Sequence, residues 1–206
     1  MHKIILDKLD YGDIKQVQLS FYDLPNTDHA DGEFRLRRYS IIDHLNVPVG
    51  ESTFTQSSDY NKYQGDVLRK FEPIEDSVLN SQCFEKMLSL FRRAGEIDLE
   101  DIEVHQMRVT VPEGMQFAEL SPEGPHQDGF DAVGIFSINR SNVCGGELLV
   151  FDDKHSHPFW TILLKPGDVV VFNDREVWHD GNRITKDVEG IELNYMDVFV
   201  FTARRD

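Results

Sequence analysis

The chain is poor in cysteine and in basic residues. Its 206 residues include 2 cysteines and 21 lysines and arginines against 37 acidic residues, which gives a formal net charge of −16. Two cysteines without a C-x-x-C spacing, Cys83 and Cys144, cannot form a disulfide framework, and a reducing cytoplasm fits best. The shortage of positive charge argues against a nucleic-acid binder and against a surface that binds anionic membranes.

The chain also lacks a membrane-spanning apolar run, a secretory signal, internal repeats and a flexible linker. Its hydrophobic content of 40% is ordinary for a globular protein, and its length allows a sizeable core. We therefore expect one cytoplasmic domain over residues 1–206. The expected partner is a small molecule, with no nucleic acid and no membrane, and a homodimer is compatible with the sequence.

Residues 1–101 give mixed signals and are expected to form an N-terminal elaboration. The alternation of Val17, Leu19 and Phe21 suggests a strand, and residues 35–42 suggest another with arginines on both faces. Helical spacing of apolar residues predicts a helix over about 77–94, with Asp76 or Ser77 as its N-cap.

Residues 102–206 are expected to form an all-β core, because short strand-like runs alternate with Gly and Pro turns. The order predicts an α+β chain whose core is a double-stranded β-helix, a cupin-like jelly roll. The expected strands are 104–111, 115–120, 132–139, 147–151, 159–164, 168–172 and 194–202.

Three side chains in this core have the chemistry of a metal site. His126 and Asp128 are two residues apart, so on an extended segment they share a face. His179 follows the strand expected over 168–172. Two imidazoles and one carboxylate form the facial triad that binds Fe(II) and leaves positions open. We predict that His126, Asp128 and His179 are the metal ligands and the catalytic centre.

Further motifs extend this pattern over most of the chain: GEFRLRRYS at 32–40, QSSDYN at 56–61, GDVLRKF at 65–71, HQMR at 105–108, NRSNVCGGE at 139–147, PGD at 166–168 and VWH at 177–179. With them, the chain resembles the iron(II)/2-oxoglutarate-dependent dioxygenases, and among these the small bacterial amino-acid hydroxylases related to isoleucine dioxygenase. The resemblance runs from about residue 32 to the end.

The resemblance implies Fe(II) as cofactor, 2-oxoglutarate as co-substrate, O₂, and hydroxylation of a free L-amino acid or similar small polar metabolite. It also implies residues that meet the amino and carboxyl groups of the substrate. These are Arg35, Arg37, Gln56, Asn61 and Arg69, for which surface hydrogen bonding is the alternative interpretation.

The chain departs from the family at the residue that should bind the far carboxylate of 2-oxoglutarate. Relatives carry an aromatic-Arg-Asp motif on the last strand, where this chain has Met196. Arg108 is the first candidate to replace that arginine, because a charge among apolar strand residues suggests an inward-facing role. Arg183, four residues after His179, and Arg204, at the end of the last strand, are further candidates, and for both a solvated surface arginine is the alternative interpretation.

Two other functions remain open at this point. One is an iron-dependent oxidase of the same fold that performs a different reaction or does not use 2-oxoglutarate. The other is a non-catalytic, cupin-like module that binds a metal or a small ligand. Asp128 argues against a halogenase, because halide would need the coordination position of the carboxylate. The net charge argues against a nucleic-acid demethylase.

Overall fold

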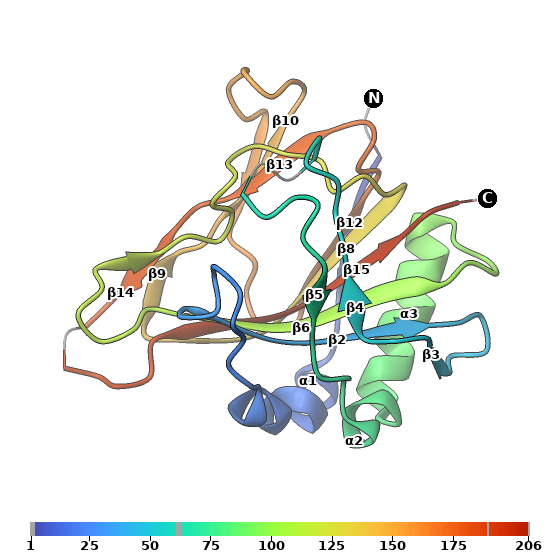
Figure 1. The fold of residues 1–206 in the computed structure, drawn as a ribbon, viewed down its shortest axis with the longest axis horizontal. Helices are drawn as coiled ribbons and strands as arrows, with labels where there is room; N and C mark the ends of the chain where they lie inside the picture. Colours follow the sequence, from blue (N-terminus) through green and yellow to red (C-terminus); the bar gives the residue numbers. More distant parts are fainter. Residues whose placement is uncertain (1–2, 61–62, 189, 206) are drawn as a thin grey trace.

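The computed structural model describes residues 3–60, 63–188 and 190–205 and is mostly β, with several antiparallel sheets and few helices (Figure 1). The expected double-stranded β-helix is therefore confirmed. The helices are α1 (Tyr11–Gln18), the 3₁₀ helix η1 (Leu19–Asp23), α2 (Asp76–Leu79) and α3 (Gln82–Gly95). The strands are β1 (Ile4–Lys8), β2 (Arg35–Ile42), β3 (Pro48–Val49), β4 (Thr53–Phe54), β5 (Arg69–Lys70), β6 (Ile102–Thr110), β7 (Phe117–Ala118), β8 (Ala132–Ser141), β9 (Val143–Gly145), β10 (Leu148–Phe151), β11 (Trp160–Ile162), β12 (Asp168–Phe172), β13 (Trp178–Gly181), β14 (Ile184–Lys186) and β15 (Tyr195–Ala203).

A seven-stranded sheet in the order β1-β12-β8-β15-β6-β2-β3 forms the larger wall of the roll. Two three-stranded sheets, β11-β10-β13 and β7-β14-β9, form the opposite wall. The large sheet is fully antiparallel, so successive strands can present one face to the helices and the other to the small sheets.

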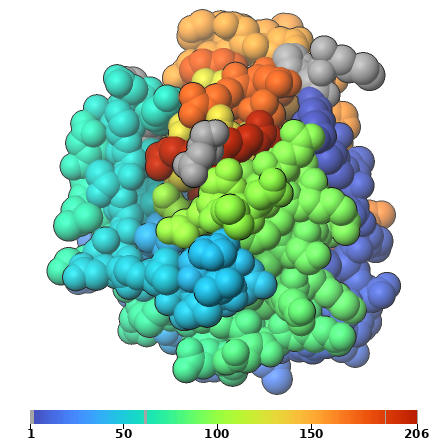
Figure 2. All heavy atoms as spheres, turned by 90° about the vertical axis from the view of Figure 1, so that its right-hand side faces the viewer, coloured from blue at the N-terminus to red at the C-terminus, as the bar shows by residue number. Residues whose placement is uncertain are grey.

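The helices cover the outer face of the large sheet. Phe84 and Phe91 of α3 stack against Phe201 of β15, with ring centroids 5.7 Å apart in both pairs. Figure 2 shows the molecule from one side, where the green segment that includes α3 forms much of the surface. None of the helices in the described residues is long and apolar enough to cross a membrane.

The strand expected around residues 17–21 is wrong, because this segment is helical. Ile14, Val17 and Phe21 are fully buried at helical spacing, while Leu19 is 76% exposed. The alternation of Val17, Leu19 and Phe21 therefore does not reflect a sheet. Three apolar residues can fit a period of two or of 3.6, and here burial against the large sheet selects the helix.

The helix expected over about 77–94 is two helices. The backbone of Ser81 is extended, which separates α2 from α3. The Ser81 hydroxyl accepts a hydrogen bond from the Phe84 N–H at 3.1 Å, so Ser81 caps the long helix rather than Asp76 or Ser77.

A β-bulge changes which face the end of β8 presents. Val198 of β15 pairs with Ser137, but Asp197 pairs with Asn139, so Ile138 is an extra residue. Ile138 is buried in the core under the helices, and the Asn139 amide donates to the Tyr195 hydroxyl. After the bulge, Arg140 pairs directly with Met196 and shares its face, toward the small sheets.

Candidate active site

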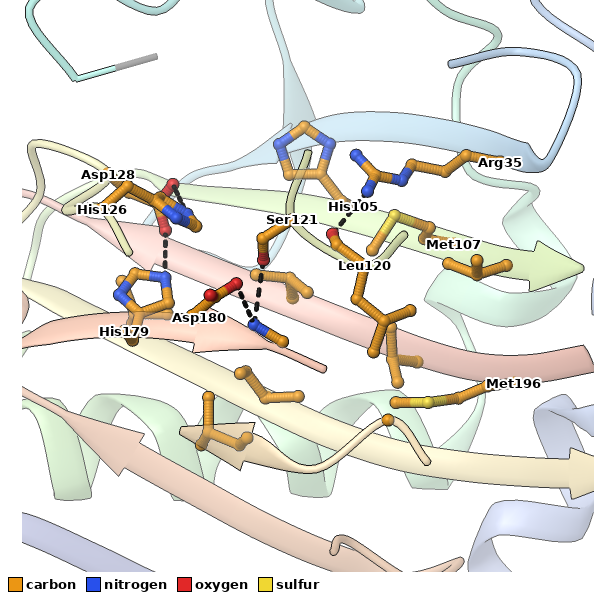
Figure 3. Close-up of a pocket in the computed structure, with 18 of the residues that line it drawn as sticks. Arg35, His105, Met107, Leu120, Ser121, His126, Asp128, His179, Asp180 and Met196 are labelled. Carbon is orange, nitrogen blue, oxygen red and sulfur yellow. Dashed lines mark hydrogen bonds and ion pairs between the residues drawn. The ribbon is translucent and has the colours of Figure 1, made fainter. Parts of the chain in front are cut away.

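The backbone brings the two predicted histidine ligands together. The loop before β8 pairs with β13 through reciprocal hydrogen bonds, each 2.9 Å, between the N–H and carbonyl groups of His126 and His179. Asp128, two residues after His126, turns toward the same point (Figure 3). The pairing joins the loop to a small sheet, so residues more than fifty positions apart meet.

The three side chains form a compact cluster of donor atoms. The Nε2 atom of His179 lies 3.3 Å from one Asp128 carboxylate oxygen, and that of His126 lies 3.6 Å from the other. If one possible ligand atom is taken from each of the three residues, all three atoms lie within 4.8 Å of one another. Two imidazole nitrogens and one carboxylate oxygen are the donor set of a non-heme Fe(II) centre, so these residues fit that metal.

A second carboxylate, which the sequence did not suggest, holds this cluster in place. Asp174 is fully buried, and one of its oxygens accepts hydrogen bonds from the backbone N–H groups of Asp128, Gly129 and Phe130 at 2.8, 2.8 and 3.2 Å. Its other oxygen lies 3.4 Å from Nδ1 of His179. Asp174 thus orients the loop that carries one ligand and the ring that carries another.

Two other contacts orient the ligands. Nδ1 of His126 lies 2.8 Å from the Gly124 carbonyl oxygen, which leaves Nε2 for a metal. The Gln56 amide donates to the Asp128 carboxylate at 3.1 Å. Burial raises the pKa of Asp128, but His179, His126 and Gln56 outweigh burial and lower it below its ordinary value. The carboxylate is therefore ionised and available as a ligand at neutral pH.

A cavity of about 180 Å³ opens beside the triad. Figure 3 shows the triad on one side of it and Met196 at the far end. Much of its wall is apolar. The apolar lining comes from the large sheet and from β10 and its neighbours: Met107, Val109, Val133, Ile135, Leu148, Leu164, Met196, Val198 and Val200.

Three of the predicted substrate residues give this cavity a positive side. Arg35 and Arg37 extend from the inner face of β2 and share one carboxylate, Asp31, at 2.9 and 3.2 Å. Burial lowers the pKa of Arg37 to about 9, so its guanidinium still carries a charge at neutral pH.

Arg69 on β5 completes the cluster and differs from the other two arginines. Only 3% of it is exposed, and its guanidinium lies over the Phe54 ring at 4.7 Å. Within the described residues, its Nε and Nη2 atoms have no hydrogen-bond partner. Buried donors are normally satisfied, so these two atoms are available to an anionic group that enters the cavity.

The remaining predicted substrate residues divide in two. Gln56 lines the cavity but donates to Asp128, so its contact is with a metal ligand. Asn61 lies outside the described residues. His105, which was not predicted to bind substrate, lines the cavity between the arginines; burial and the neighbouring charges of Arg37 and Arg69 lower its pKa well below the ordinary value. Its ring is therefore neutral, and its buried Nδ1 has no partner in the described part of the chain.

The expectation that Arg108 faces the interior of the roll is wrong. Its side chain points toward the helices, forms a bidentate ion pair with Asp197 at 2.6 and 2.8 Å, and lies between the rings of Tyr22 and Tyr195. Its neighbours on β6, Met107 and Val109, line the cavity instead. The alternation of the strand places residue 108 on the outer face.

The other two candidate arginines also lie away from the cavity. Arg183 is exposed and its guanidinium lies 4.7 Å from the centre of the Phe117 ring. Arg204 is exposed and covers the Phe130 ring at 4.4 Å. Neither residue lines the cavity that contains the triad.

Comparisons with known proteins agree with this geometry. The chain matches the 2OG-Fe dioxygenase family over residues 18–202. It is 28% identical to L-isoleucine-4-hydroxylase from Bacillus thuringiensis over 180 aligned residues. The aligned region covers 81% of this chain and 73% of that enzyme. Among solved structures, it is similar to IDO from Bacillus thuringiensis, with a TM-score of 0.81, 18% identity, and coverage of 100% of this chain and 95% of that one. It is also similar to a bsmA homolog from Methylobium petroleophilum, with a TM-score of 0.75, 25% identity, and coverage of 98% and 88%. This chain therefore belongs to the 2OG-Fe dioxygenase family, whose enzymes use Fe(II) and 2-oxoglutarate.

Proposed function

We propose that this enzyme hydroxylates a free L-amino acid or a similar small polar metabolite. The observation that carries the proposal is the buried Arg69 guanidinium, which lines the same cavity as the triad and has two donor atoms with no partner among the residues that the structure describes. The similarity to an L-isoleucine-4-hydroxylase supports the same substrate class.

The charges around the cavity favour an anionic group on the substrate. Asp31 pairs with Arg35 and Arg37, so one carboxylate faces two guanidinium groups, and Arg69 adds a third. A substrate carboxylate bound by Arg69 and Arg37 would satisfy the free donors with the bidentate geometry that arginine prefers. Glu123, which also lines the cavity, supplies a carboxylate for the substrate ammonium group.

The protein's part in the reaction is to bind and orient. His126, Asp128 and His179 would hold Fe(II), which with 2-oxoglutarate and O₂ supplies the oxidant that inserts oxygen into a C–H bond. The arginines fix the charged end of the substrate, so its side chain is directed along the apolar wall toward the triad. That wall also keeps water away from the reacting carbon.

Succinate release with a panel of L-amino acids tests the proposal. We expect one or more amino acids to stimulate succinate formation and to yield a hydroxylated product. The corresponding amines, which lack the carboxylate, should not. If no amino acid changes succinate formation or binds to the Fe(II)–2-oxoglutarate form, the proposed substrate class is wrong.

The variant Arg69→Met removes the charge while keeping a long side chain. Losing hydrogen bonds to a charged group costs about 1.5–3 kcal/mol, so we expect the KM for the amino acid to rise about 10- to 100-fold. The KM for 2-oxoglutarate should change little. The matched control is Arg183→Met, an arginine outside the cavity.

Cys83 and Cys144 are both free thiols. We infer that the enzyme works in a reducing compartment, and the cytoplasm is the simplest choice.

A further inference from the structure

We propose that Arg140 binds the far carboxylate of 2-oxoglutarate, in place of the arginine that relatives carry where this chain has Met196. The inference rests on the proposed use of 2-oxoglutarate. It assigns a role to a residue on β8 that the sequence placed in the NRSNVCGGE motif without a function of its own, and it accounts for the departure on the last strand.

The position of Arg140 follows from the bulge in β8. In a regular strand, residues 136, 138 and 140 would share a face, and Arg140 would lie with Phe136 and Ile138 on the helix-covered side. With the bulge, Arg140 lies directly opposite Met196 on the inner face. One register row therefore crosses the sheet from Arg35 on β2 through Val109 and Met196 to Arg140.

The guanidinium of Arg140 reaches the site that an arginine at position 196 would serve. Its Nη1 atom lies 3.1 Å from the Met196 sulfur and 3.1 Å from where a Cβ on Gly146 would be. Met196 and Gly146 both line the far end of the cavity, and Arg140 lies directly behind them, outside the lining itself. A side chain at position 146 would crowd the guanidinium, so glycine there lets the cation approach the cavity wall.

Arg140 lacks an anionic partner in the described part of the chain. Its two hydrogen bonds go to the Met196 sulfur, a weak acceptor, and to the Gly145 carbonyl oxygen at 2.5 Å. Glu147, the nearest acidic residue in sequence, accepts instead from the Asn182 amide. Burial lowers the pKa of Arg140 below its ordinary value, although the charge of Glu147 opposes this shift without a direct ion pair.

Arg35 is the competing candidate, because it lies in the same register row and lines the cavity. Its guanidinium, however, already pairs with Asp31 and donates to the Leu120 and Glu119 carbonyl oxygens. Arg140 is the better candidate, because an incoming carboxylate would not have to displace an existing ion pair.

The cavity connects the two ends that the co-substrate needs. The triad lies at one end and Met196 at the other, and the apolar side chains of Ile135, Val198 and Leu148 are among those that line the cavity. Met196 is unbranched and has three rotatable bonds, so its side chain can turn away and open Arg140 to the cavity. Its thioether then packs against the aliphatic part of the ligand.

Anaerobic titration of the Fe(II) protein with 2-oxoglutarate, followed by the absorption band of the complex, measures co-substrate affinity without turnover. We expect Arg140→Met to weaken 2-oxoglutarate binding about 10- to 100-fold, the loss for hydrogen bonds between charged groups. Fe(II) affinity and the melting temperature should stay close to those of the wild type. Arg183→Met is the matched control and should bind 2-oxoglutarate normally.

A second ligand identifies the group that Arg140 recognises. 2-Oxopentanoate has the same chain length as 2-oxoglutarate but ends in a methyl group. The wild type should bind it much more weakly than 2-oxoglutarate, and Arg140→Met should bind it as the wild type does. The double variant Arg140→Met/Met196→Arg, which returns the guanidinium to β15, should recover most of the lost 2-oxoglutarate affinity.

The outcomes separate this inference from the proposed function. If the wild type gives no band with Fe(II) and 2-oxoglutarate, the use of this co-substrate is wrong. If the wild type gives the band and Arg140→Met binds 2-oxoglutarate equally well, the function stands and the role of Arg140 is overturned. Equal losses for 2-oxoglutarate and 2-oxopentanoate would overturn it too, because they indicate general damage to the cavity.

Discussion

Asp174 shows how much of the site depends on one residue that does not touch the metal position. It accepts three backbone N–H groups from the loop that carries Asp128, and it faces Nδ1 of His179. Carboxylates in this position fix the tautomer and orientation of a metal-binding histidine. Its contribution is therefore to the order of the ligands before metal binds.

We expect Asp174→Asn to weaken Fe(II) binding about 10- to 100-fold, the usual cost of losing such a partner. The amide keeps one acceptor but replaces the other oxygen with a donor group, which cannot serve both the loop and His179 equally. Metal titration monitored by intrinsic fluorescence gives the affinity.

Asp131→Asn is the control for this variant. Asp131 lies in the same loop, but its carboxylate pairs with the Arg175 side chain and accepts a hydrogen bond from the Arg205 N–H. Unchanged Fe(II) affinity in Asp174→Asn would show that the triad is ordered without Asp174.

At this scale, the sequence predicted the three metal ligands, because an H-x-D pair and a later histidine are visible as spacing. It also pointed to Arg35, Arg37 and Arg69, which line the cavity. Asp174 was not recognisable, since its role comes from a loop that folds back on another loop. The role of Arg140 was not recognisable either, because the NRSNVCGGE motif that contains it does not reveal the bulge that decides which face it occupies.

Strand β6 shows how alternation sorts neighbouring side chains to opposite sides of a sheet. Met107 and Val109 line the cavity, while Arg108 lies under η1 and pairs with Asp197. Burial raises the pKa of Asp197 to about 6 although Arg108 opposes this shift. The buried ion pair links β6 to β15 and stabilises the fold, and neither residue lines the cavity.

We expect Arg108→Met to destabilise the protein by about 3–5 kcal/mol, because it leaves Asp197 buried without its partner. Urea unfolding measures this change, and 2-oxoglutarate affinity should remain near that of the wild type. The double variant Arg108→Met/Asp197→Asn should be more stable than the single one, since the unpaired charge is gone. A selective loss of 2-oxoglutarate binding in a stable Arg108→Met protein would contradict this interpretation.

The strands that the sequence predicted best are long and carry a repeated apolar pattern. Strand β12 has the expected bounds, and β6, β8 and β15 differ only at their ends. The segment around Leu19 failed because three residues carry too little periodicity to separate helix from strand. The break at Ser81 was missed because a serine inside a helical pattern does not disclose its extended backbone.

Viewed as a whole, the molecule combines a charge of −16 with a cluster of three arginines, Arg35, Arg37 and Arg69, on one side of its cavity. The surface repels itself at neutral pH, and protonation of exposed carboxylates relieves that repulsion. Asp31 responds in the opposite way. Burial raises its pKa, but Arg37 and Arg35 outweigh burial and lower it below the ordinary value.

A carboxylate with a lowered pKa in the folded state stabilises the protein fully above its unfolded pKa of about 4, and this contribution is lost as the pH falls through the folded pKa. We therefore expect the metal-free protein to lose stability below about pH 4. In Asp31→Asn this acid-dependent loss should be smaller, although the variant is less stable at pH 7. Urea unfolding between pH 3 and 7 measures both curves, and parallel curves would contradict the role of Asp31.

The bulge in β8 has a consequence for how relatives of this enzyme are recognised. A long, flexible side chain can deliver its tip to one point from either of two adjacent strands, so an essential charge can change its backbone origin while staying in place. A sequence alignment would show only that the arginine is lost at position 196, and would suggest that its function is lost too. If the enzymes are compared by where the charged ends of their side chains lie, the same contact with the ligand carboxylate is found in all of them.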